Sequence, residues 1–210
     1  MLKVTGLILI TIALAGCAST ITSREAPEYD YASHSLVGPG YPVERVIRPD
    51  GFSLVDTASE TTREDPDFSP GAKGKLRVTE ARAVWISRDG DTAVAGAMQL
   101  GLDARTSRGY WQPWSESQGT ETVSGERYQY AMYAGSYDDV VWYPNTIPND
   151  APGCGVGVQF QRDSTNREKR TRLIYSEGIN CDELVSYGRN DERRLRERAL
   201  RILGIKSRYQ

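Results

Sequence analysis

Apolar and polar residues alternate with a period of two over most of the chain from residue 43 onward. This period is typical of strands that bury one face, because successive side chains of a strand point to opposite sides of the sheet. Turn-forming residues separate the alternating runs, as they do in antiparallel hairpins. We therefore predict a mainly β protein, an antiparallel sandwich or barrel-like sheet, with a C-terminal α-helix.

Two turn signals define the first expected hairpins. Residues 43–47 and 52–55 flank the motif Arg-Pro-Asp-Gly, in which Pro presets φ and Gly accepts a positive φ, so these two runs are predicted to pair. Residues 57–74 are polar and are interpreted as a long loop. Residues 76–87 then lead into an Asp-Gly pair, the strongest hairpin signal of the chain. A two-residue turn there places Trp85 opposite Val94.

Residues 92–105 allow two interpretations. Their Ala, Met, Gln and Leu residues tolerate a helix, whereas Gly96 and Gly101 weaken a helix and the preceding turn favours a strand. We expect the strand and keep the helix as the alternative. Farther on, residues 127–132 are expected to pair with residues 140–143.

A second pair of strands is expected near the end of the sheet. Residues 154–160 and 173–175 flank a polar turn at residues 163–168. The first of these strands carries alternating glycines that resemble a phosphate-binding loop, but a strand follows them instead of the helix that such a loop requires. The glycines are therefore interpreted as room for a neighbouring ring or backbone.

The last apolar stripe of the chain has helical spacing and predicts a helix over about residues 190–203. Asp191 is expected to cap it and Gly204 to follow its end, after a helical turn at residues 182–187. The apolar stripe consists of Leu195, Ala199, Ile202 and Leu203. The rest of the helix surface carries Arg193, Arg194, Arg198 and Arg201. Either these arginines form a solvated face, or Arg194 and Arg201 contact an acidic partner, anionic lipid or lipopolysaccharide phosphate.

The N-terminal segment has the features of an export signal. Lys3 supplies a positive charge, and residues 4–13 form an apolar run that is too short to span a bilayer as a helix. We interpret residues 1–16 as a signal peptide that is removed from the mature chain.

The signal ends in Leu14-Ala15-Gly16-Cys17, which resembles the lipobox of bacterial lipoproteins. The resemblance covers only this segment. It implies cleavage before Cys17 and attachment of acyl chains to that cysteine, which anchors a protein firmly because each buried methylene contributes about 0.8 kcal/mol. The Asp that retains family members in the inner membrane is absent after Cys17. The resemblance therefore implies the periplasmic face of the outer membrane.

The mature chain is expected to have two parts. Residues 17–42 are rich in Ser, Thr, Pro, Gly and acidic residues, a composition typical of a flexible tether. Residues 43–210 are long enough for a single β-rich domain with its own core. Without residues 1–16, which hold one Lys and no acid, 25 of the 26 basic side chains remain against 28 acidic ones. This near balance argues against a nucleic-acid partner.

Two cysteines remain besides Cys17, and an even pair in an exported protein is typical of a disulfide. We predict that Cys154 and Cys181 are bonded, which stabilises the fold by about 3.5 kcal/mol on the chain-entropy estimate. The only histidine, His34, lies far from both in the sequence, so we expect no metal site and no cofactor.

Aromatic residues are concentrated between residues 110 and 143, which hold three of the four tryptophans. Three uses are open for them: the core of the sheet, a protein interface, or stacking on sugar rings. The candidates for partner or glycan binding are Trp111, Trp114, Tyr128, Tyr130, Tyr133, Tyr137 and Trp142.

Carboxylates near these rings allow a glycosidase only if two of them lie about 5 to 10 Å apart, which a sequence does not show. The carboxylates in question are Glu116, Glu121, Glu126, Asp138 and Asp139. We interpret them as solvated and name no catalytic residue.

The sequence thus predicts a non-enzymatic outer-membrane lipoprotein that serves an envelope protein assembly as a structural or accessory subunit. A glycan-binding, or less favoured glycan-cleaving, lipoprotein is the alternative.

Overall fold

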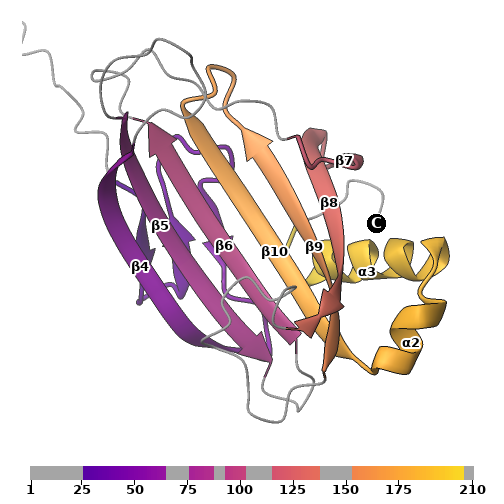
Figure 1. Cartoon of the computed structure of the whole chain (residues 1–210). Helices are drawn as coiled ribbons and strands as arrows, with labels where there is room; N and C mark the ends of the chain where they lie inside the picture. Colours follow the sequence, from indigo (N-terminus) through magenta and orange to yellow (C-terminus); the bar gives the residue numbers. More distant parts are fainter. Residues whose placement is uncertain (1–25, 65–75, 88–92, 103–114, 138–152, 206–210) are drawn as a thin grey trace, which may run out of the picture.

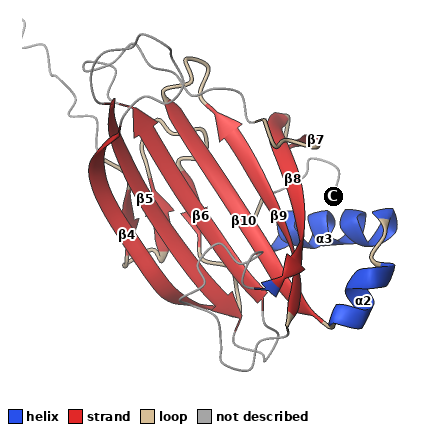
Figure 2. Cartoon of the chain, in the orientation of Figure 1, coloured by secondary structure: helices blue, strands red, loops and turns tan. Residues whose placement is uncertain are grey.

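The computed structural model describes residues 26–64, 76–87, 93–102, 115–137 and 153–205. These residues form strands and helices that Figure 1 labels along the chain and Figure 2 colours by type. The strands are β1 (Glu28–Asp30), β2 (Ser35–Val37), β3 (Arg45–Ile47), β4 (Phe52–Glu64), β5 (Leu76–Ser87), β6 (Ala93–Leu102), β7 (Gly119–Val123), β8 (Glu126–Ser136), β9 (Cys154–Asp163) and β10 (Lys169–Ile179). The helices are α2 (Cys181–Ser186) and α3 (Arg189–Ile202).

Seven strands form one antiparallel sheet in the order β4-β5-β6-β10-β9-β8-β7. The chain leaves the middle of this sheet after β6, begins again at the far edge with β7, and returns to the middle with β10. The sheet stays open, with β4 and β7 at its two edges. The prediction of a mainly β, antiparallel fold with a C-terminal helix is confirmed.

The first three strands form a second, small antiparallel sheet in the order β1-β2-β3. The tether prediction is therefore wrong for residues 26–42, and residues 17–25 lie outside the described residues. Each short strand contributes one large apolar side chain to the core: Tyr29, Leu36 and Val46, of which Leu36 is fully buried. The few apolar residues of the segment 26–42 stand among Ser, Gly, Pro and acidic residues, which gives it the composition of a linker, but Tyr29 and Leu36 pack into the core.

The Arg-Pro-Asp-Gly turn exists, but the predicted first hairpin does not. Gly51 has a φ of +78°, and the backbone N–H of Phe52 donates to the carbonyl of Pro49 at 3.2 Å. The strand before the turn, β3, pairs with β2, while the strand after it, β4, pairs with β5. The turn thus carries the chain from one sheet to the other. The predicted loop also starts too early, because residues 57–64 continue β4.

The hairpin of β5 and β6 is confirmed as a pair, but its predicted register is wrong by one residue. Trp85 lies opposite Ala95 instead of Val94. A shift of one residue turns every side chain of a strand to the other face of the sheet. As a result Ala95 and Ala97 share the packed face with Trp85, and Val94 and Met98 point to the other face. Residues 93–102 form a strand, as expected, and not the alternative helix.

The strands at the C-terminal side of the sheet agree with the predicted pattern. Strands β9 and β10 pair across the polar turn, with Tyr175 opposite Val158. Gly155 lies against a ring, because a Cβ at this position would come within 2.7 Å of Tyr137. Strand β8 pairs with β7 and β9. Its predicted partner, residues 140–143, lies outside the described residues.

The two faces of the large sheet differ in what lies over them. One face, which we call the covered face, packs against the small sheet and α3. Its side chains include Trp85, Val156, Val158, Phe160 and Leu173, all essentially inaccessible to solvent. Full burial of each large apolar side chain contributes about 1.5 to 3 kcal/mol. On the other face, the open face, no described helix or strand lies over the sheet in Figure 1.

Helices α2 and α3 follow β10 directly. Asn180 caps α2 by accepting from the N–H of Asp182 at 3.1 Å. Helix α3 begins at residue 189, so Asp191 lies inside its first turn and accepts from the N–H of Gly188 at 3.1 Å, instead of preceding the helix as predicted. The chain leaves α3 through Gly204, whose φ is +67°.

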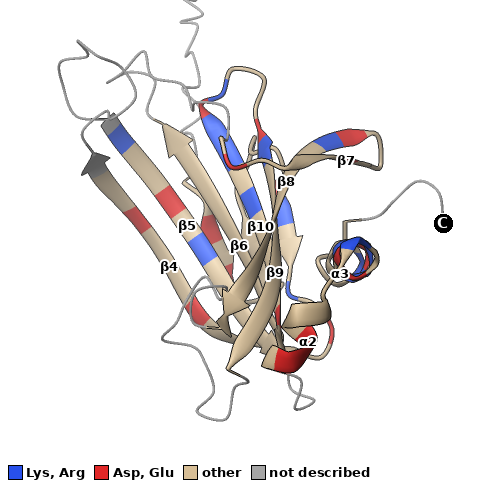
Figure 3. Ribbon diagram, turned by 45° about the vertical axis from the view of Figure 1, so that its right-hand side comes forward, with Lys and Arg blue, Asp and Glu red and all other residues tan. Residues whose placement is uncertain are grey.

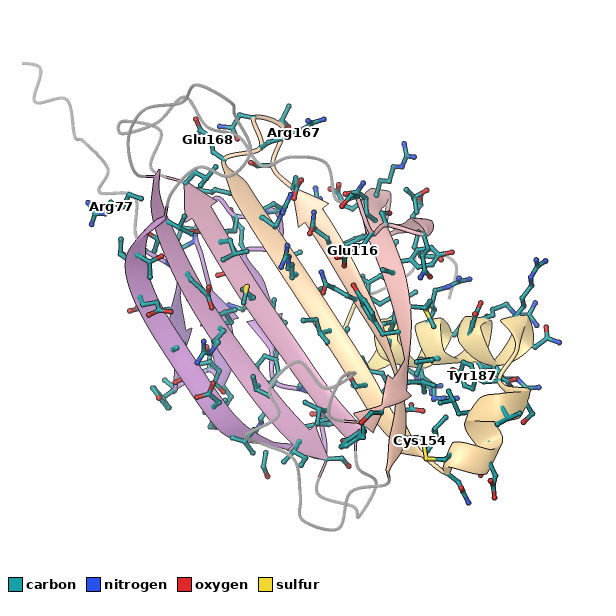
Figure 4. The ribbon with its side chains drawn as sticks, viewed as in Figure 1. Arg77, Glu116, Cys154, Arg167, Glu168 and Tyr187 are labelled. Atoms are coloured by element: carbon teal, nitrogen blue, oxygen red, sulfur yellow. A yellow bond between two sulfur atoms is a disulfide. The ribbon has the colours of Figure 1, made fainter. Side chains whose placement is uncertain are left out.

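The predicted disulfide between Cys154 and Cys181 is present. It joins the start of β9 to the start of α2, close to where β10 ends opposite Cys154. The bond therefore holds the segment that leads into α3 at one end of the sheet, as Figure 4 shows at Cys154.

Candidate functional site

The four described tyrosines of the aromatic region do not form one cluster, because they divide between the two faces of the sheet. Tyr128 and Tyr130 lie on the covered face. Tyr128 is buried, with the guanidinium of Arg162 5.9 Å from its ring centre. Burial raises the pKa of Tyr128, and the nearby positive charge of Arg162 opposes this shift. Tyr128 therefore belongs to the packed core, and Tyr130 lies at its margin.

Tyr133 and Tyr137 lie on the open face. Tyr137 is almost fully buried beside Val84 and Val94, so it is a packing residue. Tyr133 is half-buried, and its hydroxyl donates to the Glu116 carboxylate at 3.4 Å. Burial, followed by the charge of Glu116, raises the pKa of Tyr133 to about 12, so the phenol keeps its proton at neutral pH. Of the four, only Tyr133 combines partial exposure with a place on the open face.

Several predicted site residues lie outside the described residues. They are Cys17, Trp111, Trp114, Asp138, Asp139 and Trp142. The predictions for the lipid anchor and for stacking by these tryptophans therefore remain predictions.

The three described carboxylates near the rings each contact a different partner. Glu126 pairs with Arg162 at 2.5 Å, and Glu121 lies 3.8 Å from Arg196. Glu116 accepts the Tyr133 hydroxyl on the open face. Glu121 and Glu126 thus meet arginines that also contact the tyrosines of the covered face.

Two arginines of α3 bind the sheet. Arg196 donates to the Tyr130 hydroxyl at 2.8 Å, and its guanidinium lies 4.5 Å from the centre of that ring. Arg198 donates to both carboxylate oxygens of Glu177, at 2.7 and 2.6 Å. The hydrogen bonds to Glu177 raise the pKa of Arg198 above its ordinary value, and desolvation partly opposes this shift. Sequence reasoning did not single out Arg196, and it placed Arg198 on the remaining surface.

The other arginines of α3 face solvent. Arg189, Arg193 and Arg201 are exposed and stand on one line of the helix surface, because they differ in number by multiples of four. Arg194 is 70% exposed, and its one ion pair with a described residue is a 4.0 Å contact with Asp191 of its own helix. Figure 3 shows this ring of charge around α3, with acidic residues on the neighbouring α2. The two predicted contact residues, Arg194 and Arg201, therefore lie on one accessible surface, which we call the outer face of α3.

The open face carries rows of side chains that run across the strands. One row consists of Gln129, Gln161, Arg172, Met98 and Arg82, each opposite the next on neighbouring strands. The adjacent row places Asp163 opposite Arg170. In Figure 3 the blue and red bands on β5 and β10 mark the charged residues of both faces of these strands. None of the residues in the β8–β10 part of these rows was named as a candidate from the sequence.

Arg172 lies at one end of a chain of hydrogen bonds. Its Nε donates to the side-chain oxygen of Gln161 at 3.1 Å, and the Gln161 amide donates to Asp163 at 3.4 Å. Asp163 also accepts two hydrogen bonds from Arg170, at 2.7 and 3.0 Å. Burial, and then the positive charge of Arg170, lowers the pKa of Arg172. The signal that could have revealed this site is the alternation of Gln in β9 and Arg in β10.

The described part of the chain shows no cluster of His, Cys, Asp and Glu that could hold a metal ion. None of its helices combines the length and apolarity that crossing a membrane demands. Comparisons with protein-family models, with curated proteins and with solved structures found no match.

Proposed function

We propose that this protein is a non-enzymatic outer-membrane lipoprotein, anchored through Cys17, that serves an envelope assembly as an accessory subunit. In this proposal the outer face of α3 binds an acidic surface of a partner protein in the periplasm. The observation that carries the proposal is the division of the arginines within α3. Arg196 and Arg198 bind the sheet, whereas Arg189, Arg193 and Arg201 contact no acidic group among the described residues.

Charge complementarity supports an acidic protein as the occupant of this face. Arginine presents a planar set of donors that binds carboxylates in a bidentate manner, and arginine is enriched in protein interfaces. The exposed face also contains Glu197 between Arg193 and Arg201, which a purely anionic lipid surface would repel. A partner with mixed but mainly acidic charge fits this arrangement better than a membrane does.

The anchoring part of the proposal predicts the location of a Cys17→Ser variant. This variant cannot receive acyl chains and is expected to leave the outer-membrane fraction for the soluble periplasmic fraction. Fractionation of cells and mass spectrometry of the N-terminal peptide measure both effects. Recovery of the variant in the outer membrane at the wild-type level, or a wild-type Cys17 without lipid, would contradict the anchor.

Site-specific photo-crosslinking in intact cells tests the partner. A photoreactive amino acid at Glu197 should give one defined protein adduct, because this residue lies in the middle of the outer face. The same probe at Arg127, an exposed residue of β8, is the matched control. The proposal fails if no protein adduct forms at residue 197, if both positions give the same adducts, or if only lipid is captured.

A further inference from the structure

The open face holds an arginine whose hydrogen-bonding capacity is mostly unused. A guanidinium has five N–H donors, and Arg172 uses one of them, at Nε, to bind Gln161. Within the described part of the chain, neither terminal nitrogen of Arg172 meets a hydrogen-bond acceptor or a carboxylate within ion-pair distance. Arg172 is half-buried, so these donors are neither fully hydrated nor satisfied by the protein.

Among the described residues, no carboxylate contacts the guanidinium of Arg172 directly. Asp163 is held by Arg170 through two hydrogen bonds, so this pair is neutral as a unit. The negative charge of Glu116 favours the charged form of Arg172, but the hydrogen bond of its carboxylate is to the Tyr133 hydroxyl and not to the guanidinium. Desolvation and the positive charge of Arg170 both lower the pKa of Arg172, because both disfavour its charged form. An anion that binds its terminal nitrogens would offset both costs.

Neutral polar groups flank the guanidinium on the same face. Gln129 and Gln161 lie opposite each other in the row of Arg172, and Gln159 lies in the next row, opposite Ala131. Among the described residues, the side-chain amides of Gln129 and Gln159 have no hydrogen-bond partner, although Gln159 is only 8% exposed. Amides donate and accept at once, which suits sugar hydroxyls. Tyr133 adds a half-buried ring on the same side of the sheet.

We propose that the open face binds an acidic saccharide at Arg172, which holds the sugar carboxylate, while Gln129 and Gln159 bind neighbouring hydroxyls. Two parallel N–H donors match the two oxygens of a carboxylate, and the terminal nitrogens of Arg172, which no described carboxylate contacts, favour an acidic sugar over a neutral one. Gln161 acts as a positioning residue, because it fixes Nε of Arg172 and is fixed by Asp163. This site is separate from the outer face of α3 and goes beyond the proposed accessory function.

Titration calorimetry with three defined probes tests the site, using the full-length protein in a non-ionic detergent. The probes are trigalacturonate, the neutral galactotriose, and galactose 6-phosphate. We expect trigalacturonate to bind about tenfold or more tightly than galactotriose, because only the acid makes charge-assisted hydrogen bonds. Failure of the wild-type protein to bind trigalacturonate, or equal binding of galactotriose, would overturn the proposal. Preferential binding of galactose 6-phosphate would replace the carboxylate with a phosphate and would also overturn it.

Four variants separate binding from folding. Arg172→Gln should weaken trigalacturonate binding about tenfold or more, and Arg172→Lys should weaken it less, because lysine keeps the charge but loses the planar pair of donors. Glu116→Gln should strengthen binding about two- to threefold by removing a nearby negative charge. Arg194→Gln on the outer face of α3 is the matched control and should leave binding unchanged. Unchanged trigalacturonate binding by Arg172→Gln, or weaker binding by Glu116→Gln, would contradict the assignment of the sugar carboxylate to Arg172. The two variants are expected to change binding in opposite directions, so a loss of stability in one of them does not prevent the test.

Discussion

The inner and outer sides of α3 carry the same residue type for different purposes. On the inner side, Leu195 and Ala199 are completely buried, and Arg196 and Arg198 bind Tyr130 and Glu177 of the sheet. On the outer side, the remaining arginines are exposed and touch no part of the sheet. An arginine-rich helix is therefore not a binding surface on all its sides, because part of its charge stabilises the fold. Mutations on the two sides should therefore have separate effects.

The largest effect is expected for Leu195→Ala, which removes a completely buried side chain between α3 and the sheet. We expect a loss of about 4 kcal/mol in the free energy of unfolding, since truncation leaves a cavity as well as losing apolar contact. Urea-induced unfolding followed by circular dichroism measures this loss. Val185→Ala on α2, where the side chain is 91% exposed, is the control and should change little. A loss below about 1 kcal/mol for Leu195→Ala would mean that α3 does not pack as described.

The disulfide should rank next, because it holds the start of α2 against β9 and so limits the movement of α3. Replacing Cys154 and Cys181 together with Ser should lower the free energy of unfolding by about 3.5 kcal/mol, mainly by freeing the unfolded chain. Urea unfolding under non-reducing conditions provides the measurement. Addition of a reductant should bring the wild type down to the double variant and leave that variant unchanged. Equal stability of oxidised wild type and double variant would refute a stabilising role.

A smaller effect is expected for the inward arginine. Arg198→Ala removes two hydrogen bonds to Glu177, a carboxylate that also accepts from Tyr175. Because the Arg198 side chain is 39% exposed, we discount the pair for screening by solvent and expect a loss of about 1 kcal/mol. The measurement is again urea unfolding, repeated at high salt, where the difference from the wild type should shrink. A loss that does not respond to salt would point to lost packing in place of lost charge.

The smallest stability effect belongs to the outer face. Arg194→Ala and Arg201→Ala should each change the free energy of unfolding by less than about 0.5 kcal/mol, since neither side chain contacts the sheet. Thermal melting of both single variants beside Arg198→Ala gives the comparison directly. If Arg194→Ala or Arg201→Ala melted like Arg198→Ala or lower, the outer face would be part of the fold, and the distinction between the two sides would be lost.

Sequence reasoning predicted those parts of the fold whose signals are local. The β9–β10 pair and the apolar stripe of α3 each have their signal in one short stretch, and the Cys154–Cys181 bond followed from the even number of cysteines besides Cys17. Strands β1 and β2 were missed because each is three residues long and contributes one large apolar side chain to the core. Residues 43–47, which contain β3, were predicted as a strand but with β4 as the partner instead of β2. The β5–β6 register was missed because a turn of unknown length decides it, and one residue reverses the faces.

The candidate sites were harder to predict because they depend on contacts between distant segments. Arg196 and Arg198 look like any exposed arginine in the sequence, and only the path of α3 over the sheet brings them to Glu121, Tyr130 and Glu177. The row that contains Gln129, Gln161 and Arg172 forms only when β8, β9 and β10 lie in register. Arg194 and Arg201 are exposed, which both interpretations of these arginines required, whereas Arg198 of the same predicted face binds Glu177.

The most direct test of the account is recovery of the partner by a double variant, Arg194→Ala with Arg201→Ala. After crosslinking in intact cells and affinity isolation from solubilised membranes, the variant should fold normally and yet lose the protein that the wild type recovers. Without crosslinking, recovery by the wild type should fall as salt is added, because exposed charges are screened. The control is Arg77→Ala with Arg127→Ala, two exposed arginines away from α3, which should keep the partner. Undiminished recovery of the partner by the Arg194/Arg201 variant would contradict the role of the outer face.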